Sequence, residues 1–280
     1  MSEYLGQHFL VNKEKLKKIA EALELKDGDL VIEIGAGHGE LTEELRSTNR
    51  ELRIIAIEKD KKLAEFLRKK FASDKNIEII QEDALKFLSS IIHNSLFKIQ
   101  NYKIVGNIPY YITGRLLRIL SELAASPKRG EPRPEISGRE NKPSLIVLTI
   151  QKEVAERICA QPPKMNLLAA AVQFWAKPKI ISYISRKDFR PIPKVDSAII
   201  KILSIAFKQR SLGKCYREGN YYKFIKILFK QPRKTIANNL AEGLKIPKEK
   251  IIKNLADLGI KPNERAQNLS MAQLKNFLLF

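Results

Sequence analysis

The sequence is poor in the residues and patterns that mark several classes of protein. Two cysteines among 280 residues, Cys159 and Cys215, are too few for a disulfide framework and lack metal-ligand spacing, as do the three histidines. No apolar run approaches the roughly 18 residues that a membrane span needs. The first residues lack the basic and apolar regions of a signal peptide. We therefore expect a cytoplasmic protein without a metal centre, a disulfide scaffold or a membrane anchor.

Acidic residues are scarce in the second part of the chain. The whole sequence has 51 Lys and Arg against 31 Asp and Glu, a net charge of +20. Residues 1–110 carry 18 of each sign, residues 111–204 carry 17 basic and 8 acidic, and residues 205–280 carry 16 basic and 5 acidic. Basic clusters bind polyanions by releasing counterions, although lysine-rich surfaces also serve solubility alone. An asymmetry of this size favours nucleic acid as a partner.

Short apolar runs alternate with helical periodicity through the first 150 residues. Runs typical of strands lie at 29–34, 53–57, 77–80, 103–105 and 145–150, with helical patterns at 12–25, 40–46, 61–71 and 114–124. Helical patterns at 152–159 and 167–175 and strand patterns at 180–185 and 198–203 follow. This alternation is typical of a parallel sheet covered by helices on both faces, so we predict an α/β fold.

The C-terminal part differs from the rest, because residues 221–280 show only helical periodicity. We predict two domains, a catalytic α/β domain over 1–205 and a small basic all-α domain over 206–280, joined by a linker within 205–219. Four prolines and two glycines at 126–143 predict an exposed loop.

Glycines and acids follow successive predicted strands. The turn Gly35-Ala36-Gly37-His38-Gly39 follows the first strand, Glu58 closes the second and Asp83 follows the third. Glycines permit a tight turn and close approach to a ligand, and an acid after the second strand suits ribose hydroxyls. Each acid alone is more often a loop residue or a helix cap. In this order, at the ligand-binding edge of an open sheet, they predict a nucleotide-like cofactor.

The motif Asn107-Ile108-Pro109-Tyr110 follows the fourth strand. One chemistry that this motif would suit is methylation of the N6 amine of adenine. The lone pair of that amine is delocalised into the ring, so a site that methylates it should accept hydrogen bonds from the amine. The Asn107 side-chain oxygen and the Ile108 carbonyl are suitable acceptors, and Pro109 restricts the backbone that carries that carbonyl. The Tyr110 ring would stack on an extruded base. A nicotinamide site, which also suits the glycine turn, gives no reason for this motif.

These motifs resemble those of the ribosomal RNA adenine dimethyltransferase family, most closely its small-subunit branch. The resemblance covers nearly the whole chain and extends to residues 6–10, 151–157, 189–197 and 233–240. It implies a Rossmann-like, seven-stranded S-adenosylmethionine methyltransferase sheet with a small helical C-terminal domain. It also implies N6,N6-dimethylation of two adjacent adenosines in the 3′-terminal hairpin of 16S rRNA, within the 30S particle or its precursor, and a role in small-subunit biogenesis.

The resemblance also assigns roles to residues at matching positions. Catalytic roles are implied for Asn107, Ile108, Pro109, Tyr110 and Phe189, with Phe189 stacking on the adenine opposite Tyr110. Contacts to S-adenosylmethionine are implied for His8, Leu10, Gly35, Glu58, Asp83 and Asn107. At His8 the family usually has asparagine, so this contact departs from the common pattern.

Two other functions compete with this prediction. A macrolide-resistance enzyme, which methylates one adenine of large-subunit rRNA, shares the glycine turn and the Asn-x-Pro-Tyr motif; the segments at 194–197 and 233–240 favour the small-subunit branch. A non-catalytic RNA-binding assembly factor is disfavoured by the intact Asn107, Tyr110 and both acids. Nothing in the sequence indicates more than a monomer.

Overall fold

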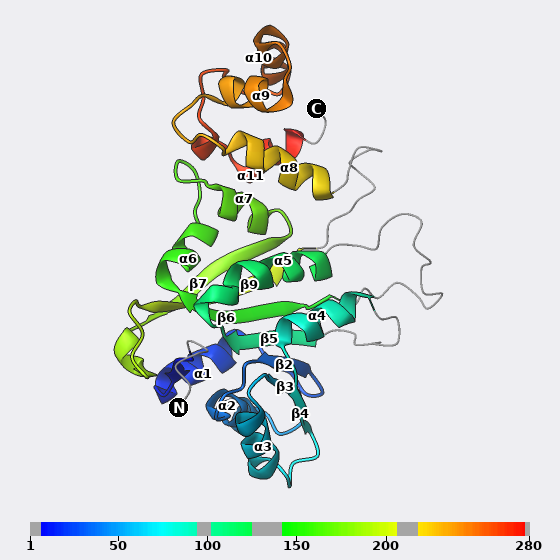
Figure 1. The fold of residues 1–280 in the computed structure, drawn as a ribbon, viewed down its shortest axis with the longest axis vertical. Helices are drawn as coiled ribbons and strands as arrows, with labels where there is room; N and C mark the ends of the chain where they lie inside the picture. The colour runs from blue at the N-terminus through cyan, green and yellow to red at the C-terminus, as the bar shows by residue number, and fades with distance from the viewer. Residues whose placement is uncertain (1–6, 94–101, 125–141, 206–217, 278–280) are drawn as a thin grey trace. The chain divides into compact units, whose positions relative to one another are not determined.

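The computed structural model describes residues 7–93, 102–124, 142–205 and 218–277 (Figure 1). The chain divides into two compact units, Met1–Ala155 with Lys177–Ile205 and Glu156–Ala176 with Ala206–Phe280. This division differs from the predicted domains of 1–205 and 206–280 because residues 156–176 group with the C-terminal part. The predicted linker at 209–214 and the predicted loop up to residue 141 lie outside the described residues.

A seven-stranded sheet with the order β4-β3-β2-β5-β6-β9-β7 organises the first unit. The strands are β2 (Leu30–Ile34), β3 (Arg53–Glu58), β4 (Ile77–Gln81), β5 (Tyr102–Asn107), β6 (Leu145–Gln151), β7 (Ala176–Ile184) and β9 (Ser197–Ser204). The pairs from β4 through β6 are parallel, and β9 runs antiparallel to β6. The predicted α/β class and seven-stranded sheet are thus confirmed.

The strand order reverses between β2 and β5. The chain runs from β2 outward through β3 to β4 and then returns to β5 on the other side of β2. At such a point the connections after the two central strands leave in opposite directions and open a crevice at the strands' carboxyl ends. The ends of β2 and β5 are therefore where this fold places a ligand.

Helices cover both faces of the sheet (Figure 1). One face carries α1 (Lys13–Ala22), α2 (Glu40–Thr48) and α3 (Lys61–Lys70), and the other carries α4 (Ala84–His93) and α5 (Thr113–Ala124). Two of these helices are capped by a side chain at the N-terminus. Asn12, before α1, accepts a hydrogen bond from the Lys15 amide at 3.2 Å, and Asp60, before α3, accepts one from the Lys62 amide at 2.8 Å. These caps satisfy amides that the first helical turn leaves unpaired.

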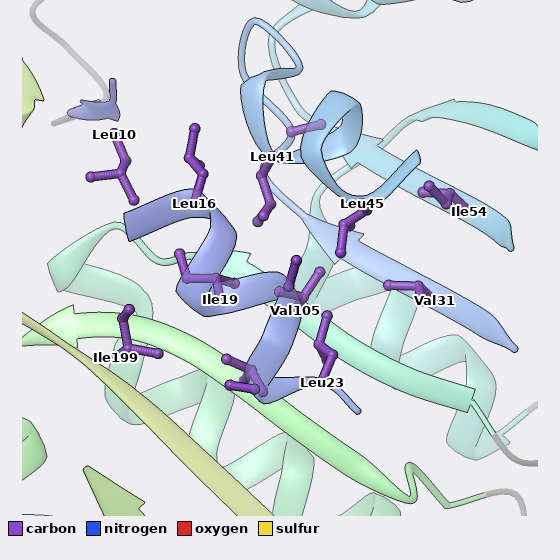
Figure 2. Packing of buried hydrophobic residues seen from close by; sticks show 14 of the residues in the cluster. Leu10, Leu16, Ile19, Leu23, Val31, Leu41, Leu45, Ile54, Val105 and Ile199 are labelled. Atoms are coloured by element: carbon purple, nitrogen blue, oxygen red, sulfur yellow. The ribbon is translucent and has the colours of Figure 1, made fainter. Parts of the chain in front are cut away.

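The core between α1 and the sheet is formed by aliphatic side chains (Figure 2). Leu16 and Ile19 recur at helical spacing on α1 and are 6% and 1% exposed. They pack in the same cluster as Val105 of β5 and Ile199 of β9. Each such side chain contributes about 1.5–3 kcal/mol when it is fully buried, so this layer fixes α1 on the strands that carry the predicted site.

A second, two-stranded sheet brings the N-terminal segment to residue 190. Strand β1 (Phe9–Leu10) pairs antiparallel with β8 (Phe189–Arg190), which follows the 3-10 helix η3 (Arg186–Asp188). The Val11 amide donates to the Asp188 carbonyl at 2.9 Å. The sequence did not predict these strands, because two residues are too short for an alternating pattern.

The second unit is helical. It contains α7 (Leu167–Gln173), α8 (Glu218–Leu228), α9 (Ile236–Leu244), α10 (Lys248–Asp257), the 3-10 helix η5 (Ala266–Asn268) and α11 (Met271–Asn276), while α6 (Lys152–Ile158) crosses the unit boundary. The Phe174 ring, after α7, stacks on Tyr221 of α8 with centroids 3.9 Å apart. The Tyr221 hydroxyl donates to the Ala170 carbonyl at 3.1 Å. These contacts explain why residues 156–176 belong to the helical unit.

No helix in the described ranges is long and apolar enough to cross a membrane.

Candidate functional site

A pocket of the first unit lies where β2, β3 and β5 end. Most residues that the sequence singled out line it, together with residues from the N-terminal segment and from β8. They are Gln7, His8, Phe9, Ile34, Gly35, Gly37, Ile57, Glu58, Lys59, Glu82, Asp83, Ala84, Asn107, Ile108, Pro109, Tyr110, Tyr111, Ile112 and Phe189.

The glycine turn forms the wall of the pocket after β2. Gly35 and Gly37 have φ values of +69° and +60°, which L side chains rarely adopt. A Cβ on Gly35 would meet no atom within 4 Å, so its backbone faces open space. A Cβ on Gly37 would lie 2.8 Å from the Phe9 ring. Gly37 thus allows the N-terminal segment to lie close against the turn.

Glu58 is 3% exposed and ties the end of β3 to the glycine turn. Its Oε2 accepts a hydrogen bond from the Gly37 amide at 2.9 Å, and its Oε1 accepts from the Asp60 amide at 2.8 Å. A carboxylate oxygen has two acceptor positions. Each oxygen therefore keeps one position for a ligand hydroxyl.

Asp83 also lines the pocket and begins α4. Its Oδ1 accepts from the Leu85 amide at 2.9 Å, as a helix cap does, and its Oδ2 pairs with the Lys59 ammonium at 3.1 Å. Partial burial raises the pKa of Asp83, but the Lys59 hydrogen bond and charge and the amides of α4 outweigh it, so the pKa is lowered overall. The group is a carboxylate at neutral pH.

Asn107 is held in one orientation at the end of β5. Its Nδ2 donates to the His8 carbonyl at 2.7 Å, a partner that only accepts, so the amide oxygen Oδ1 points away from it. The next amide, of Ile108, donates to the Thr149 carbonyl on β6 at 3.0 Å. Within the described part of the chain, no group donates to Asn107 Oδ1 or to the Ile108 carbonyl. Two acceptors therefore remain available beside the pocket.

Pro109 and Tyr110 continue this wall. Pro109 has φ −56° and ψ 133°, and it leads into the short 3-10 helix η2 (Tyr110–Ile112). The Tyr110 hydroxyl lies 3.1 Å from Ser197 Oγ on β9. Burial and the nearby Asp196 charge raise the pKa of Tyr110 despite that hydrogen bond, so the phenol stays protonated. The ring is half-buried.

Of the remaining predicted site residues, His8 and Phe189 line the pocket and Leu10 does not. His8 lines the pocket through the N-terminal segment, and its Nδ1 lies 2.9 Å from the Pro191 carbonyl. Leu10 is 4% exposed and does not line this pocket; it lines a smaller neighbouring cavity. Phe189 lines the pocket but is only 1% exposed, opposite Leu10 in the β1–β8 pair. Stacking on a base would therefore require residues over the Phe189 ring to move.

Sequence reasoning did not single out Glu33, a buried acid in β2. It is 1% exposed and accepts from Thr42 Oγ1 at 2.6 Å. Burial raises its pKa to about 8, with Glu40 and Glu58 adding to the shift and the Thr42 hydrogen bond opposing it. An acid inside an otherwise apolar strand was the available signal. Glu33 is mostly protonated at pH 7, so it adds little negative charge beside the turn.

This arrangement is suited to a nucleoside-containing ligand. Open backbone at Gly35, an acceptor at Glu58 and a second carboxylate at Asp83 lie along one sheet edge, and the Asn107 and Ile108 oxygens lie at its switch point. Within the described ranges, no group of three or more His, Cys, Asp or Glu side chains could hold a metal ion.

Solved structures with similar folds include a dimethyladenosine transferase and an rRNA methyltransferase. A dimethyladenosine transferase from Plasmodium falciparum has a TM-score of 0.74 and 24% identity, with 97% of this chain and 96% of that chain covered. The 23S rRNA methyltransferase ErmE has a TM-score of 0.69 and 23% identity, with 97% and 98% covered. At this identity the two structures establish the fold.

Sequence relatives establish the family. A protein of Dehalococcoides mccartyi named ribosomal RNA small subunit methyltransferase A is 39% identical over 275 residues, which cover 98% of this chain and 86% of the relative. A Fusobacterium nucleatum protein of the same name is 36% identical over 271 residues, 95% and 92% of the two chains. The profile of the ribosomal RNA adenine dimethylase family matches residues 2–279. The chain therefore belongs to the ribosomal RNA adenine dimethylase family.

Proposed function

We propose that this protein uses S-adenosylmethionine to dimethylate N6 of two adjacent adenosines in the 3′-terminal hairpin of small-subunit rRNA. The substrate would be the 30S particle or its precursor in the cytoplasm, the enzyme would act as a monomer, and it would contribute to small-subunit biogenesis. The observation that carries the proposal is the fixed Asn107 side chain, whose Nδ2 is bonded to the His8 carbonyl while Oδ1 remains available.

The first pocket wall fits S-adenosylmethionine. When bound, this cofactor supplies a sulfonium methyl group that a nitrogen lone pair attacks. Glu58 would accept hydrogen bonds from the ribose hydroxyls through its two remaining acceptor positions, and Asp83 would accept one from the exocyclic amine of the cofactor. Gly35 leaves space for the ligand backbone, and His8 and Asn107 would border it. The Leu10 contact would be made beside the smaller cavity that Leu10 lines with Gly35 and Asn107.

The second wall fits an extruded adenine. Asn107 Oδ1 and the Ile108 carbonyl would each accept a hydrogen bond from N6, which favours a pyramidal nitrogen with an available lone pair. Fixing both acceptors before the substrate binds reduces the reorganisation needed in the transition state. The Tyr110 ring, held through its hydroxyl on Ser197, would stack on one face of the base. Phe189 would stack on the other face once residues over it have moved.

The helical unit supplies a basic surface for RNA phosphates. Lys223 and Lys226 lie on the exposed face of α8, whereas Tyr221 and Ile225 on its other face are fully buried. Lys230, just after the end of α8, is also exposed and pairs with Glu242 at 3.5 Å. The first unit adds four exposed basic side chains around η3 and β8: Arg186, Lys187, Arg190 and Lys194. Charges of this kind bind RNA without regard to sequence, so base specificity would come from the pocket.

The small-subunit substrate is supported by relatives that share nearly the full length of the chain and carry that name. The large-subunit alternative has support only at the level of fold, through ErmE at 23% identity. The intact site geometry argues against a solely structural assembly factor.

The test is methyl transfer from labelled S-adenosylmethionine to undermethylated 30S subunits and, separately, to 50S-derived particles, followed by nucleoside analysis. We expect N6,N6-dimethyladenosine in small-subunit rRNA alone. Label confined to large-subunit rRNA would move the function to the resistance branch. Binding to 30S subunits without any methylation would favour the assembly factor.

A further inference from the structure

We propose that Tyr111 and Arg115 form a subsite for the nucleotide next to the target adenosine, with the Tyr111 ring stacking on its base and Arg115 binding a phosphate. This inference rests on the proposed function and extends it from the target base to its neighbour.

Tyr111 differs from Tyr110 although both belong to η2. A 3-10 helix has three residues per turn, so successive side chains leave it about 120° apart. Tyr110 is directed towards β9, where its hydroxyl meets Ser197. Tyr111 is 65% exposed, and within the described part of the chain it has no hydrogen-bond, ion-pair or ring partner. Both line the same pocket, which places the Tyr111 ring at the rim.

Arg115 lies four residues after Tyr111, in the first turn of α5, into which the 3-10 helix η2 leads directly. Arg115 is exposed, and no described residue pairs with its guanidinium. An exposed ring and an exposed guanidinium four residues apart, neither paired within the described residues, offer a stacking surface and a phosphate ligand near the pocket rim.

The substrate's geometry gives such a pair a purpose. Extruding one adenosine from the RNA removes a stacking partner from the adjacent base, at a cost of a few kcal/mol. A ring at the pocket rim would replace that partner and hold the strand while N6 lies against Asn107. In a substrate with two adjacent adenosines, the same ring would support whichever neighbour is outside the pocket.

The test compares the Tyr111→Ala and Tyr111→Phe variants of the full chain on undermethylated 30S subunits. We expect Tyr111→Ala to lower kcat/KM about 5- to 150-fold, the fold-change that corresponds to loss of one base stack of roughly 1–3 kcal/mol. Tyr111→Phe should stay close to wild type because the ring is kept. The affinity for S-adenosylmethionine and the Tm should not change in either variant, since so exposed a ring leaves no cavity when it is removed.

Tyr183→Ala is the matched control, because Tyr183 is 48% exposed on β7 but does not line the pocket. Its kcat/KM should equal that of the wild type.

Arg115→Gln should weaken binding to 30S subunits. It should also lower the slope of log K against log salt by about the amount that corresponds to one phosphate contact. Wild-type kcat/KM in Tyr111→Ala, or equal losses in the Ala and Phe variants, would overturn the subsite alone. A wild-type enzyme inactive on 30S subunits would overturn the proposed function itself.

Discussion

Glu33 shows how one residue sets the charge of the site. It lies two residues before Gly35, the first residue of the glycine turn, and a charged carboxylate there would lie close to Glu58 in a buried region. Burial instead keeps Glu33 protonated over most of the physiological range, and its Oε2 accepts a hydrogen bond from the Thr42 hydroxyl. The ribose acceptor proposed at Glu58 therefore faces less like-charge repulsion than the sequence indicates.

This burial predicts a pH dependence of stability. Because the pKa of Glu33 rises from 4.5 to about 8 on folding, the folded chain binds this proton more tightly than the unfolded chain does. The free energy of unfolding should therefore fall as pH rises from about 4.5 to 8 and should level off above pH 8. The total fall should be on the order of a few kcal/mol, because each pKa unit corresponds to about 1.4 kcal/mol. Glu33→Gln should flatten this fall in urea titrations at a series of pH values, whereas Glu65→Gln, on the exposed side of α3, should not. An unchanged pH profile in Glu33→Gln would contradict the assignment.

At the scale of elements, the N-terminal segment depends on the glycine turn. The β1–β8 pair carries the His8 carbonyl to Asn107, and the Phe9 ring occupies the space that a Cβ on Gly37 would need. The segment and the turn therefore form one wall of the pocket.

Gly37→Ala should disturb that wall. The positive φ alone should lower the free energy of unfolding by about 1–2 kcal/mol, and displacement of Phe9 should weaken S-adenosylmethionine binding about tenfold, or ~1.4 kcal/mol. Gly28→Ala is the control: its φ is +75°, and a Cβ there would meet no atom within 4 Å. It should lose similar stability and keep full affinity in calorimetry. Equal affinities in the two variants would show that β1 does not shape the cofactor site.

Much of this element-level structure follows from the sequence. Strand patterns at 53–57 and 77–80 correspond to β3 and to the edge strand β4, because both strands are short apolar runs, and their ends place Glu58 and Asp83 in the pocket. The strand predicted at 180–185 begins at Ala176, since polar residues alternate along β7. The burial of Leu10 and Phe189 was not predictable, because it depends on pairing between segments about 180 residues apart.

At the scale of the whole molecule, the residues that build the pocket and the residues that carry most of the positive charge lie in different parts of the chain. The neutral N-terminal residues build most of the pocket, and the helical unit carries a basic face on α8. The sequence periodicity predicted the helix α7, but it did not predict which hydrophobic core α7 packs into, because an apolar helix fits either unit. Cutting the chain after residue 205 would uncover Met165 and Phe174 of the helical core, so charge substitutions test RNA binding more cleanly than truncation.

The triple variant Lys223→Gln, Lys226→Gln and Lys230→Gln should weaken binding to 30S subunits and lower the slope of log K against log salt. Each lost phosphate contact should change the slope by about 0.7–0.9, so the total should approach 2 to 3. The control removes three exposed lysines of α3, Lys61, Lys62 and Lys69, and should keep the wild-type slope. Filter binding across a salt series measures both, and equal slopes would exclude these three lysines as part of a docking surface.

The most direct test of the account is the N6,N6-dimethyladenosine content of small-subunit rRNA after undermethylated 30S subunits are incubated with wild type or Asn107→Ala. Asn49→Ala serves as control, because Asn49 donates a similar side-chain hydrogen bond, to Asp27 at 2.8 Å, outside the pocket. We predict dimethyladenosine with wild type and Asn49→Ala, and a loss of about 100-fold or more in rate with Asn107→Ala, as when one positioned polar group is removed from an active site. Near-wild-type methylation by Asn107→Ala would contradict the account.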